Sequence, residues 1–338
     1  MKSNGGIARY FTETLNAIKK NDPNTCLEVI IPAGTNKPHS LACRENGRLS
    51  TSFAVLRGDV FHTSYYTRWP RLKIPIITTV YDFIDASFPL LSPNGNGFIQ
   101  RQIDTIRRSS AVISISKSTK ELICQFAGID SSKVYLAYPG VSFPFSGSQP
   151  DYQDIRKFVQ LITGGAPYIL HVGTRGNYKN FRTILRAYSL AAQSKYSERH
   201  LVLIGGEHAL APDEIDMVVS SGIIDRVHLL HGLTDKMLHL AYAGADAMVS
   251  ASLMEGFGIP IVESLSCGTG LILSDISVYR EIAEGYAIFL RANSVDDWVT
   301  ALIGETPPVE AGWKDSIINK FNWDTAAQTH LNVYSALI

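Results

Sequence analysis

The chain has 338 residues, of which 45% are hydrophobic and 18% charged, and its 31 basic and 31 acidic residues leave it without net charge. A single hydrophobic core rarely grows beyond about 300 residues, so this length predicts two domains of roughly 150 residues each. The composition excludes disordered and fibrous classes, and the balanced charge argues against a nucleic-acid partner, because phosphate backbones require a clustered basic surface.

Short runs of β-branched and aliphatic residues alternate with longer amphipathic segments along both halves of the chain. This alternation is typical of parallel sheets with helical crossovers, and it predicts an α/β protein with two Rossmann-like, doubly wound domains that face a cleft. The expected strands of the first half lie at 27–32, 59–62, 74–82, 111–116 and 134–141. Those of the second half lie at 168–174, 200–206, 227–232, 246–252, 270–274 and 287–290.

A stretch rich in Pro, Gly and Ser, PFSGSQPDY, separates the two series of strands and is the best candidate for a linker. The C-terminal tail from about Asn322 has apolar residues at broadly helical spacing, which predicts a closing helix. We therefore expect a first domain at 1–145, a second at 146–321 and a C-terminal helix at 322–338.

The cysteines show no spacing typical of metal ligands, and we expect them to be buried, reduced thiols. The chain has no signal-peptide pattern and no stretch that approaches the ~20 apolar residues of a membrane span. These features predict a cytoplasmic protein. The cysteines are Cys26, Cys43, Cys124 and Cys267.

Two carboxylates bracket a Gly-Phe-Gly turn in the stretch LMEGFGIPIVESLSCGTG (253–270). The pattern predicts a buried strand, a turn, and then a helix that accommodates Pro260 in its first turn and ends at Gly268. Glu255 then lies in the loop at the carboxyl end of the strand, and Glu263 lies about one turn into the helix.

Glycines and a helix start favour a bound anion at this turn. Gly256 and Gly258 let the backbone approach a ligand, and the N–H groups of the helix start attract a phosphate. Glu263 would then accept hydrogen bonds from sugar hydroxyls, and Glu255 would face a second group of hydroxyls. The alternative is that Glu255 is a solvent-exposed side chain and Glu263 a capping residue.

Two cations follow another expected strand, in HVGTRGNYKNF (171–181). Arg175 and Lys179 fall in the loop before the next helix, where a guanidinium and an ammonium can hold a diphosphate. The alternative is a pair of solvated loop charges. Gly5 and Gly6 precede the first helix and are a further candidate for backbone contacts with a phosphate, with a structural turn as the alternative.

Several segments, taken together, resemble the retaining glycosyltransferases of family 4, which have the GT-B fold, and among them the mannosyltransferase-like branch. The segments are EGFGIPIVESLSCG, VGTRGNYKNF, GGIARYF, ISISKSTKEL and YPGV, and they occur in the expected order over nearly the whole chain. The resemblance implies transfer of a hexose, with mannose as first choice and GDP-mannose as donor, to a glycan or lipid-linked acceptor. It also implies retention of the anomeric configuration and no metal ion or other cofactor.

The resemblance carries roles over to the matching residues. Arg175 and Lys179 would neutralise the leaving diphosphate, and Glu255 would contact the donor sugar. Glu263 would hold the ribose hydroxyls. Backbone N–H groups of 256–258, including that of Phe257, would bind the donor.

Two departures from the family pattern affect the first domain. Where many members have a His-Asp pair, this chain has TVYDFID, so that Tyr81 replaces the histidine and Asp82 remains. We expect Asp82 to position the acceptor, with a cap at the strand end as the alternative. Members usually have a strand before the Gly-Gly loop, whereas only MKSN precedes it here, so we expect the first strand to be missing or to lie upstream.

Other functions remain open on the residues alone. A noncatalytic or truncated relative that binds nucleotide sugars fits the missing strand, and a GT-B epimerase would need a further acid/base pair. The segment 101–110 has Arg101, Arg107 and Arg108 on an expected helix, which would suit peripheral contact with anionic lipids at the inner membrane face. A solvated helix face is the alternative.

Overall fold

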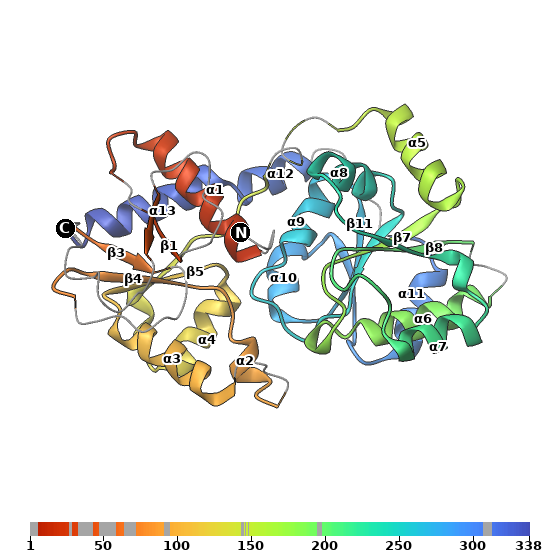
Figure 1. Cartoon of the computed structure of the whole chain (residues 1–338), viewed down its shortest axis with the longest axis horizontal. Coiled ribbons are helices and arrows are strands. Elements are labelled where there is room, and N and C mark those ends of the chain that lie inside the picture. Colours follow the sequence, from red (N-terminus) through yellow and green to blue (C-terminus); the bar gives the residue numbers. More distant parts are fainter. Residues whose placement is uncertain are drawn as a thin grey trace. The chain divides into compact units, whose positions relative to one another are not determined.

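The chain divides into two compact units (Figure 1). Unit 1 comprises Met1–Gly140 and Phe321–Ile338, and unit 2 comprises Val141–Lys320. Each unit contains a parallel sheet, which confirms the expected α/β class. The computed structural model describes residues 6–26, 29–32, 43–46, 59–63, 72–90, 95–142, 145, 147, 149–194, 198–306 and 313–338.

Unit 1 has a four-stranded parallel sheet in the order β3-β4-β5-β6 and a separate parallel pair, β1-β2. Figure 1 shows α3 and α4 on one face of the larger sheet and α1 with α13 on the other. The bounds are α1 Gly6–Asn21, β1 Val29–Pro32, β2 Cys43–Asn46, β3 Phe61–Thr63, β4 Ile76–Val80, α2 Ile84–Ser87, α3 Gly95–Arg108, β5 Ala111–Ser114, α4 Lys117–Ala127, β6 Val134–Leu136 and α13 Trp323–Ser335.

Local sequence explains where these elements end and how the C-terminal helix joins unit 1. Helix α4 begins at Ser116, whose side chain accepts a hydrogen bond from Thr119 N, and it ends at Gly128 in the left-handed conformation. A Cβ atom at Gly140 would collide with the backbone and ring of Trp323. A glycine at this point therefore lets the chain leaving β6 pass closely beside the start of α13.

Unit 2 has a six-stranded parallel sheet in the order β12-β11-β10-β7-β8-β9. Helices α6, α7 and α11 pack together, as do α8, α9, α10 and α12, and Figure 1 shows the two groups on opposite faces. The bounds are α5 Tyr152–Thr163, β7 Tyr168–Val172, α6 Phe181–Ala192, β8 His200–Ile204, α7 Pro212–Ser220, β9 Val227–Leu230, α8 Asp235–Ala243, β10 Ala247–Ser250, α9 Ile259–Ser266, β11 Gly270–Ser274, α10 Ser277–Ala283, β12 Ala287–Leu290, α11 Val295–Ile303 and α12 Trp313–Lys320.

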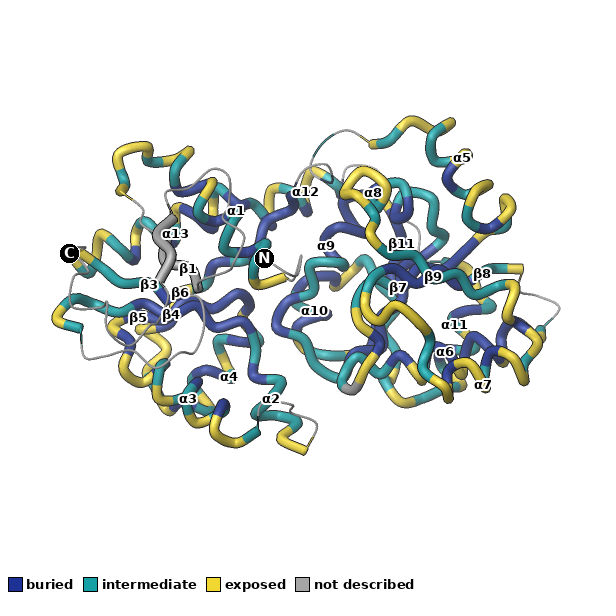
Figure 2. The backbone as a smooth tube through the Cα atoms, in the orientation of Figure 1, coloured by how far each residue is buried: buried dark blue, intermediate teal, exposed yellow. Residues whose placement is uncertain are grey.

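The hydrophobic core of unit 2 is built around the central strands of its sheet. Strands β10 and β11 are buried along their whole length, whereas the edge strands β9 and β12 are half-buried (Figure 2). Trp298 of α11 and Tyr188 of α6 are fully buried in the same cluster as Val249 of β10. Burial on both faces accounts for the nearly continuous apolar runs in the sequence of these strands.

The predicted strands and several predicted helix boundaries are confirmed. All eleven expected strand segments contain a strand, Thr234 caps α8 through Met237 N, and α9 has Pro260 in its first turn. Strand β2 was not expected, because Cys43–Asn46 reads CREN and lacks an apolar pattern. Cys267 is buried as expected, but Cys26 is exposed, and the expectation of burial was wrong for it. No helix in the described ranges has the length and apolar character needed to cross a membrane.

Buried histidines in both units, among them His330 and His171, make stability depend on pH. Burial lowers the pKa of His330 in unit 1 and that of His171 in unit 2 to about 4. In the unfolded chain both pKa values lie near ~6.5, so between pH 6.5 and pH 4 the unfolded chain binds protons that the folded chain does not. We expect the free energy of unfolding to be about 2 kcal/mol lower per histidine at pH 5 than at pH 7.

Denaturant unfolding at the two pH values measures this loss. In the variant His330→Phe, the difference between the free energies of unfolding at pH 7 and pH 5 should be smaller by the contribution of one histidine. Equal unfolding midpoints of the unmodified chain at pH 5 and pH 7 would contradict the expectation.

Candidate functional site

The strand order of unit 2 reverses between β7 and β10. From β7 the chain proceeds outward through β8 to β9, and it then returns to the other side of β7 and proceeds through β10 and β11 to β12. Loops that leave neighbouring strands at such a reversal diverge to opposite faces of the sheet, and ligands bind in the crevice between them. The two sequence motifs occupy these loops, 173–180 after β7 and 251–258 after β10.

Contacts between the two loops bring predicted residues together. Leu253 N donates a hydrogen bond to Tyr178 O at 2.8 Å, which ties the backbones to each other. Lys179 Nζ lies 2.6 Å from Glu255 Oε1, and the two side chains are 21% and 12% exposed. The alternative that Glu255 is an exposed side chain is therefore wrong. An ammonium and a carboxylate meet where the strand order reverses, and each keeps some access to solvent.

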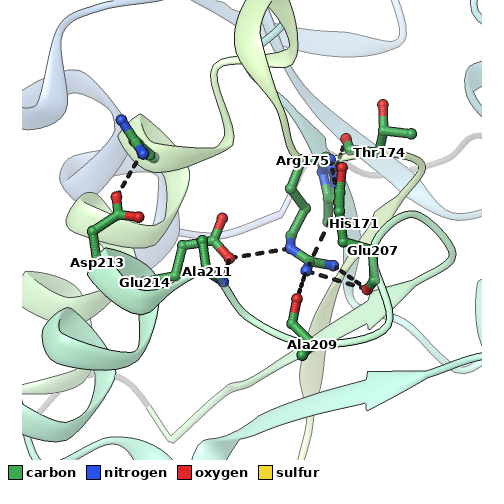
Figure 3. Close-up of polar contacts among 9 residues, drawn as sticks. His171, Thr174, Arg175, Glu207, Ala209, Ala211, Asp213 and Glu214 are labelled. Atoms are coloured by element: carbon green, nitrogen blue, oxygen red, sulfur yellow. Dashed lines mark hydrogen bonds and ion pairs between the residues drawn. The ribbon is translucent and has the colours of Figure 1, made fainter.

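Arg175 lies in the same loop but turns toward the protein (Figure 3). Its side chain is 2% exposed, and its guanidinium donates to the carbonyl oxygens of Glu207 and Ala209. Its Nε donates to Glu214 Oε2 at 3.4 Å, and Glu214 also accepts from Ala211 N at 2.8 Å. The guanidinium thus anchors the loop after β8 and the start of α7. The expected contact of Arg175 with a diphosphate stays a prediction.

The Gly-Phe-Gly turn leads directly into α9. Gly258 is the N-cap with φ of 115°, and a Cβ atom there would come within 2.9 Å of Ile261 Cδ1. Gly256 and Phe257 are buried. No acidic residue occupies the first turn of α9, so the partial positive charge of the helix start is not neutralised within the helix itself.

Glu263 lies in the middle of α9 and is buried. It is 3% exposed, and Tyr242 OH donates to its Oε2 at 3.0 Å. Burial, followed by the negative charge of Glu263, raises the pKa of Cys267, which keeps that thiol protonated. The expected contact of Glu263 with ribose hydroxyls is not tested by this geometry.

The candidates from the first domain lie in unit 1. Asp82 follows β4, and its Oδ1 accepts a hydrogen bond from Ile84 N at 3.0 Å at the start of α2. The N-cap of α2 is Phe83, so this bond closes a turn after β4, and the contact of Asp82 with an acceptor stays a prediction. Gly6 is the first residue of α1, and Gly5 lies outside the described residues.

Two residues at the site were not recognised in the sequence. Asn180 follows Lys179 with φ of 51°, and among described residues no other non-glycine residue has a positive φ. Its side chain donates to Ala292 O at 2.9 Å, so it links the loop after β7 to the loop after β12. An Asn directly before a helix is a readable signal for the left-handed conformation. Tyr279 of α10 lies against Gly258 and Glu255, and nothing in the local sequence indicates this contact.

In the part of the chain that the structure describes, no group of three or more His, Cys, Asp or Glu side chains is arranged to hold a metal ion. The groups that the structure places at the strand reversal are an ammonium, a carboxylate, hydroxyls and the start of a helix.

Comparisons with known proteins find relatives of both halves of the chain. The model of Glycosyl transferases group 1 matches residues 153–303, and that of Glycosyltransferase Family 4 matches residues 23–143. The O-antigen chain mannosyltransferase RfbU of Salmonella typhimurium is 26% identical over 198 residues, 59% of this chain and 51% of that protein. The match thus spans about half the length of RfbU.

Two further comparisons cover more of the chain. The O-antigen chain mannosyltransferase B of Escherichia coli is 26% identical over 292 residues, which is 82% of this chain and 75% of that protein. The crystal structure of HepE from Anabaena in complex with UDP and glucose is similar in fold, with a TM-score of 0.75 at 16% identity, and the match covers 100% of this chain and 98% of that one.

Proposed function

The chain is a family 4 glycosyltransferase with the GT-B fold, and we propose that it transfers a hexose, mannose in the first instance, from a nucleotide-diphosphate sugar to a glycan or lipid-linked acceptor. GDP-mannose is the donor of first choice, because the curated relatives RfbU and mannosyltransferase B are named mannosyltransferases. The observation that carries the proposal is the meeting of Lys179 and Glu255 at the strand reversal of unit 2.

The leaving diphosphate is the group whose charge must be stabilised. Lys179 supplies an ammonium, and the start of α9 at Gly258 supplies backbone dipoles, both of which stabilise developing negative charge without a metal ion. Arg175 anchors the loop after β8, because its guanidinium is bonded to protein groups. Lys179 is then the principal cation for the diphosphate.

Glu255 and Glu263 face two parts of the donor in this proposal. Glu255 accepts hydrogen bonds from hydroxyls of the hexose, and Glu263 accepts hydrogen bonds from ribose hydroxyls. A binding site that pairs its carboxylates with hydroxyls discriminates strongly, because an analogue without the hydroxyl leaves the carboxylate unpaired.

The reaction retains the anomeric configuration in this proposal. The bond between C1 of the sugar and the phosphate oxygen breaks, and its electron pair leaves with the diphosphate. The acceptor oxygen forms its bond to C1 on the same face, through a transition state that resembles an oxocarbenium ion. The acceptor proton passes to the departing phosphate oxygen.

We place the acceptor contacts in unit 1, with Asp82 as the candidate that orients the acceptor hydroxyl, and the enzyme at the cytoplasmic side of the membrane. Peripheral contact with lipid would suit a lipid-linked acceptor. Of the three arginines considered for such contact, Arg107 donates to Ala127 O at 2.8 Å and is held against α4. Arg101 lies over the ring of Phe98.

A donor screen tests the proposal. The purified chain is incubated with GDP-, UDP-, ADP- and dTDP-sugars in the presence of EDTA, with and without a pool of glycan and lipid-linked acceptors, and nucleotide release is measured. Release that depends on acceptor, with a product of unchanged anomeric configuration by NMR, supports a retaining, metal-independent transferase. Binding of a donor without any turnover supports a noncatalytic binding protein. An epimerised nucleotide sugar supports the epimerase.

A further inference from the structure

Three hydrogen-bond donors converge on a single oxygen of Glu255. Lys179 Nζ lies 2.6 Å, Ser252 Oγ 2.7 Å and Tyr279 OH 3.4 Å from Oε1. No described residue donates a hydrogen bond to Oε2. The carboxylate is therefore held by one oxygen and offers the other.

The hydroxyl groups beside Glu255 form a directed chain. Tyr279 OH lies 2.7 Å from Ser250 Oγ at the end of β10. An ionised carboxylate only accepts, and each hydroxyl donates once, so Ser250 donates to Tyr279 and Tyr279 donates to Glu255. Hydrogen bonds in such a chain polarise one another, which strengthens the last one, to the charged oxygen.

Tyr279 is buried between these groups. It is 2% exposed, and its ring carbon Cε1 would lie 3.4 Å from a Cβ atom at Gly258, the N-cap of α9. Burial, followed by the charge of Glu255, raises the pKa of Tyr279 well above its ordinary value, so the phenol remains protonated and remains a donor. One buried side chain thus links the end of β10, the carboxylate of the loop and the start of α9.

We propose that Tyr279 is a positioning residue that fixes the carboxylate of Glu255 so that Oε2 alone accepts a hydroxyl of the donor sugar, and that this makes Tyr279 a determinant of which sugar epimer is transferred. The inference rests on the proposed function, in which Glu255 faces the hexose. A carboxylate that is free to rotate can accept hydrogen bonds from hydroxyls in several directions. One that is held by Oε1 accepts them from a narrower range of directions. Discrimination between epimers follows from that restriction.

The variant Tyr279→Phe removes only the hydroxyl. The measurement is kcat/KM for the preferred donor and for its epimer at one hydroxyl-bearing carbon of the hexose, with the same acceptor. We expect kcat/KM for the preferred donor to fall about tenfold, the scale of a hydrogen bond to a charged group. We expect the ratio of kcat/KM for the preferred donor to kcat/KM for its epimer to fall about fivefold, because the same hydrogen bond is lost.

Two further variants make the result specific. Tyr188→Phe is the matched control, because Tyr188 is also a buried tyrosine of unit 2, and its hydroxyl donates to Arg199 O at 2.9 Å before the start of β8. It should leave the donor ratio unchanged. Ser252→Ala removes another donor to Oε1 and should shift the ratio in the same direction as Tyr279→Phe, which keeps the test decisive if Tyr279→Phe does not fold.

The outcomes separate the two proposals. An unmodified chain that turns over no nucleotide sugar overturns the proposed function, and this inference falls with it. If the unmodified chain is active and the variants at Tyr279 and Ser252 lower kcat/KM for both epimers equally, or not at all, Tyr279 has no part in selecting the sugar. In the background Glu255→Ala, a Tyr279→Phe change that still weakens donor binding by calorimetry would also overturn the positioning role.

Discussion

The variant Lys179→Ala is expected to lower kcat/KM for sugar transfer about 100-fold or more, because removal of one preorganised charge contact to a developing anion has an effect of this size. Lys179 is also expected to act mainly on kcat, since the charge on the diphosphate grows as the bond to C1 breaks. The side chains of this pair with Glu255 are 21% and 12% exposed, between the exposed and buried limits, so its loss should cost the fold about 1 to 3 kcal/mol.

Steady-state kinetics and denaturant unfolding, measured on the same preparation, separate the two effects. Lys157→Ala is the matched control, because Lys157 lies on α5 of the same unit with a side chain that is 78% exposed. It should match the unmodified chain in both measurements. Transfer by Lys179→Ala within twofold of the unmodified rate would remove Lys179 from the site.

The variant Arg175→Ala is expected to destabilise unit 2 by about 3 kcal/mol or more, the usual cost of breaking a buried charge pair from one side. Glu214, with a side chain 6% exposed, would be left with a buried charge, and two carbonyl groups would lose their donors. If Arg175 instead acts mainly on the leaving diphosphate, the variant folds normally and loses transfer. Unfolding free energy and kcat together decide between the two roles.

The chain provides a matched control whose acidic partner lies on the same helix, α7, as Glu214. Arg182 lies 2.8 Å from Asp213, the neighbour of Glu214, but its side chain is 71% exposed. Arg182→Ala should cost about 1 kcal/mol or less, because solvent screens an exposed pair. The double change Arg175→Met with Glu214→Met should recover part of the lost stability, since apolar side chains can replace a buried pair.

Signals that act over a few residues allowed much of the fold to be predicted. Apolar runs located the strands, Thr234 located the start of α8, and Pro260 with Gly268 bounded α9. The proximity of Lys179 and Glu255 follows from parallel strands whose loops leave one edge of a sheet. Placing both motifs after strands of one domain predicted that they share one edge of the sheet, whereas their contact also requires β7 and β10 to be neighbours, which was not predicted.

What could not be predicted depends on the order of strands. The partners of Arg175, Glu207 and Glu214, come 32 and 39 residues later, and they reach it because β8 lies beside β7. Tyr279 reaches Glu255 for a similar reason, since β11 precedes α10 and pairs with β10. The sequence of a loop does not distinguish a cation that faces a ligand from one that is bonded to a neighbouring loop.

The allocation of Phe321–Ile338 to unit 1 has a consequence for how the chain folds as it is synthesised. Unit 2 is continuous, from Val141 to Lys320, so all its strands are available before the last helix has been made. Unit 1 lacks α13, which packs on α1, until the whole of unit 2 has been synthesised. Domains generally fold as units during synthesis and usually begin with the N-terminal one. Here the segments of unit 1 that precede unit 2 are completed by α13 only after the inserted unit has been synthesised.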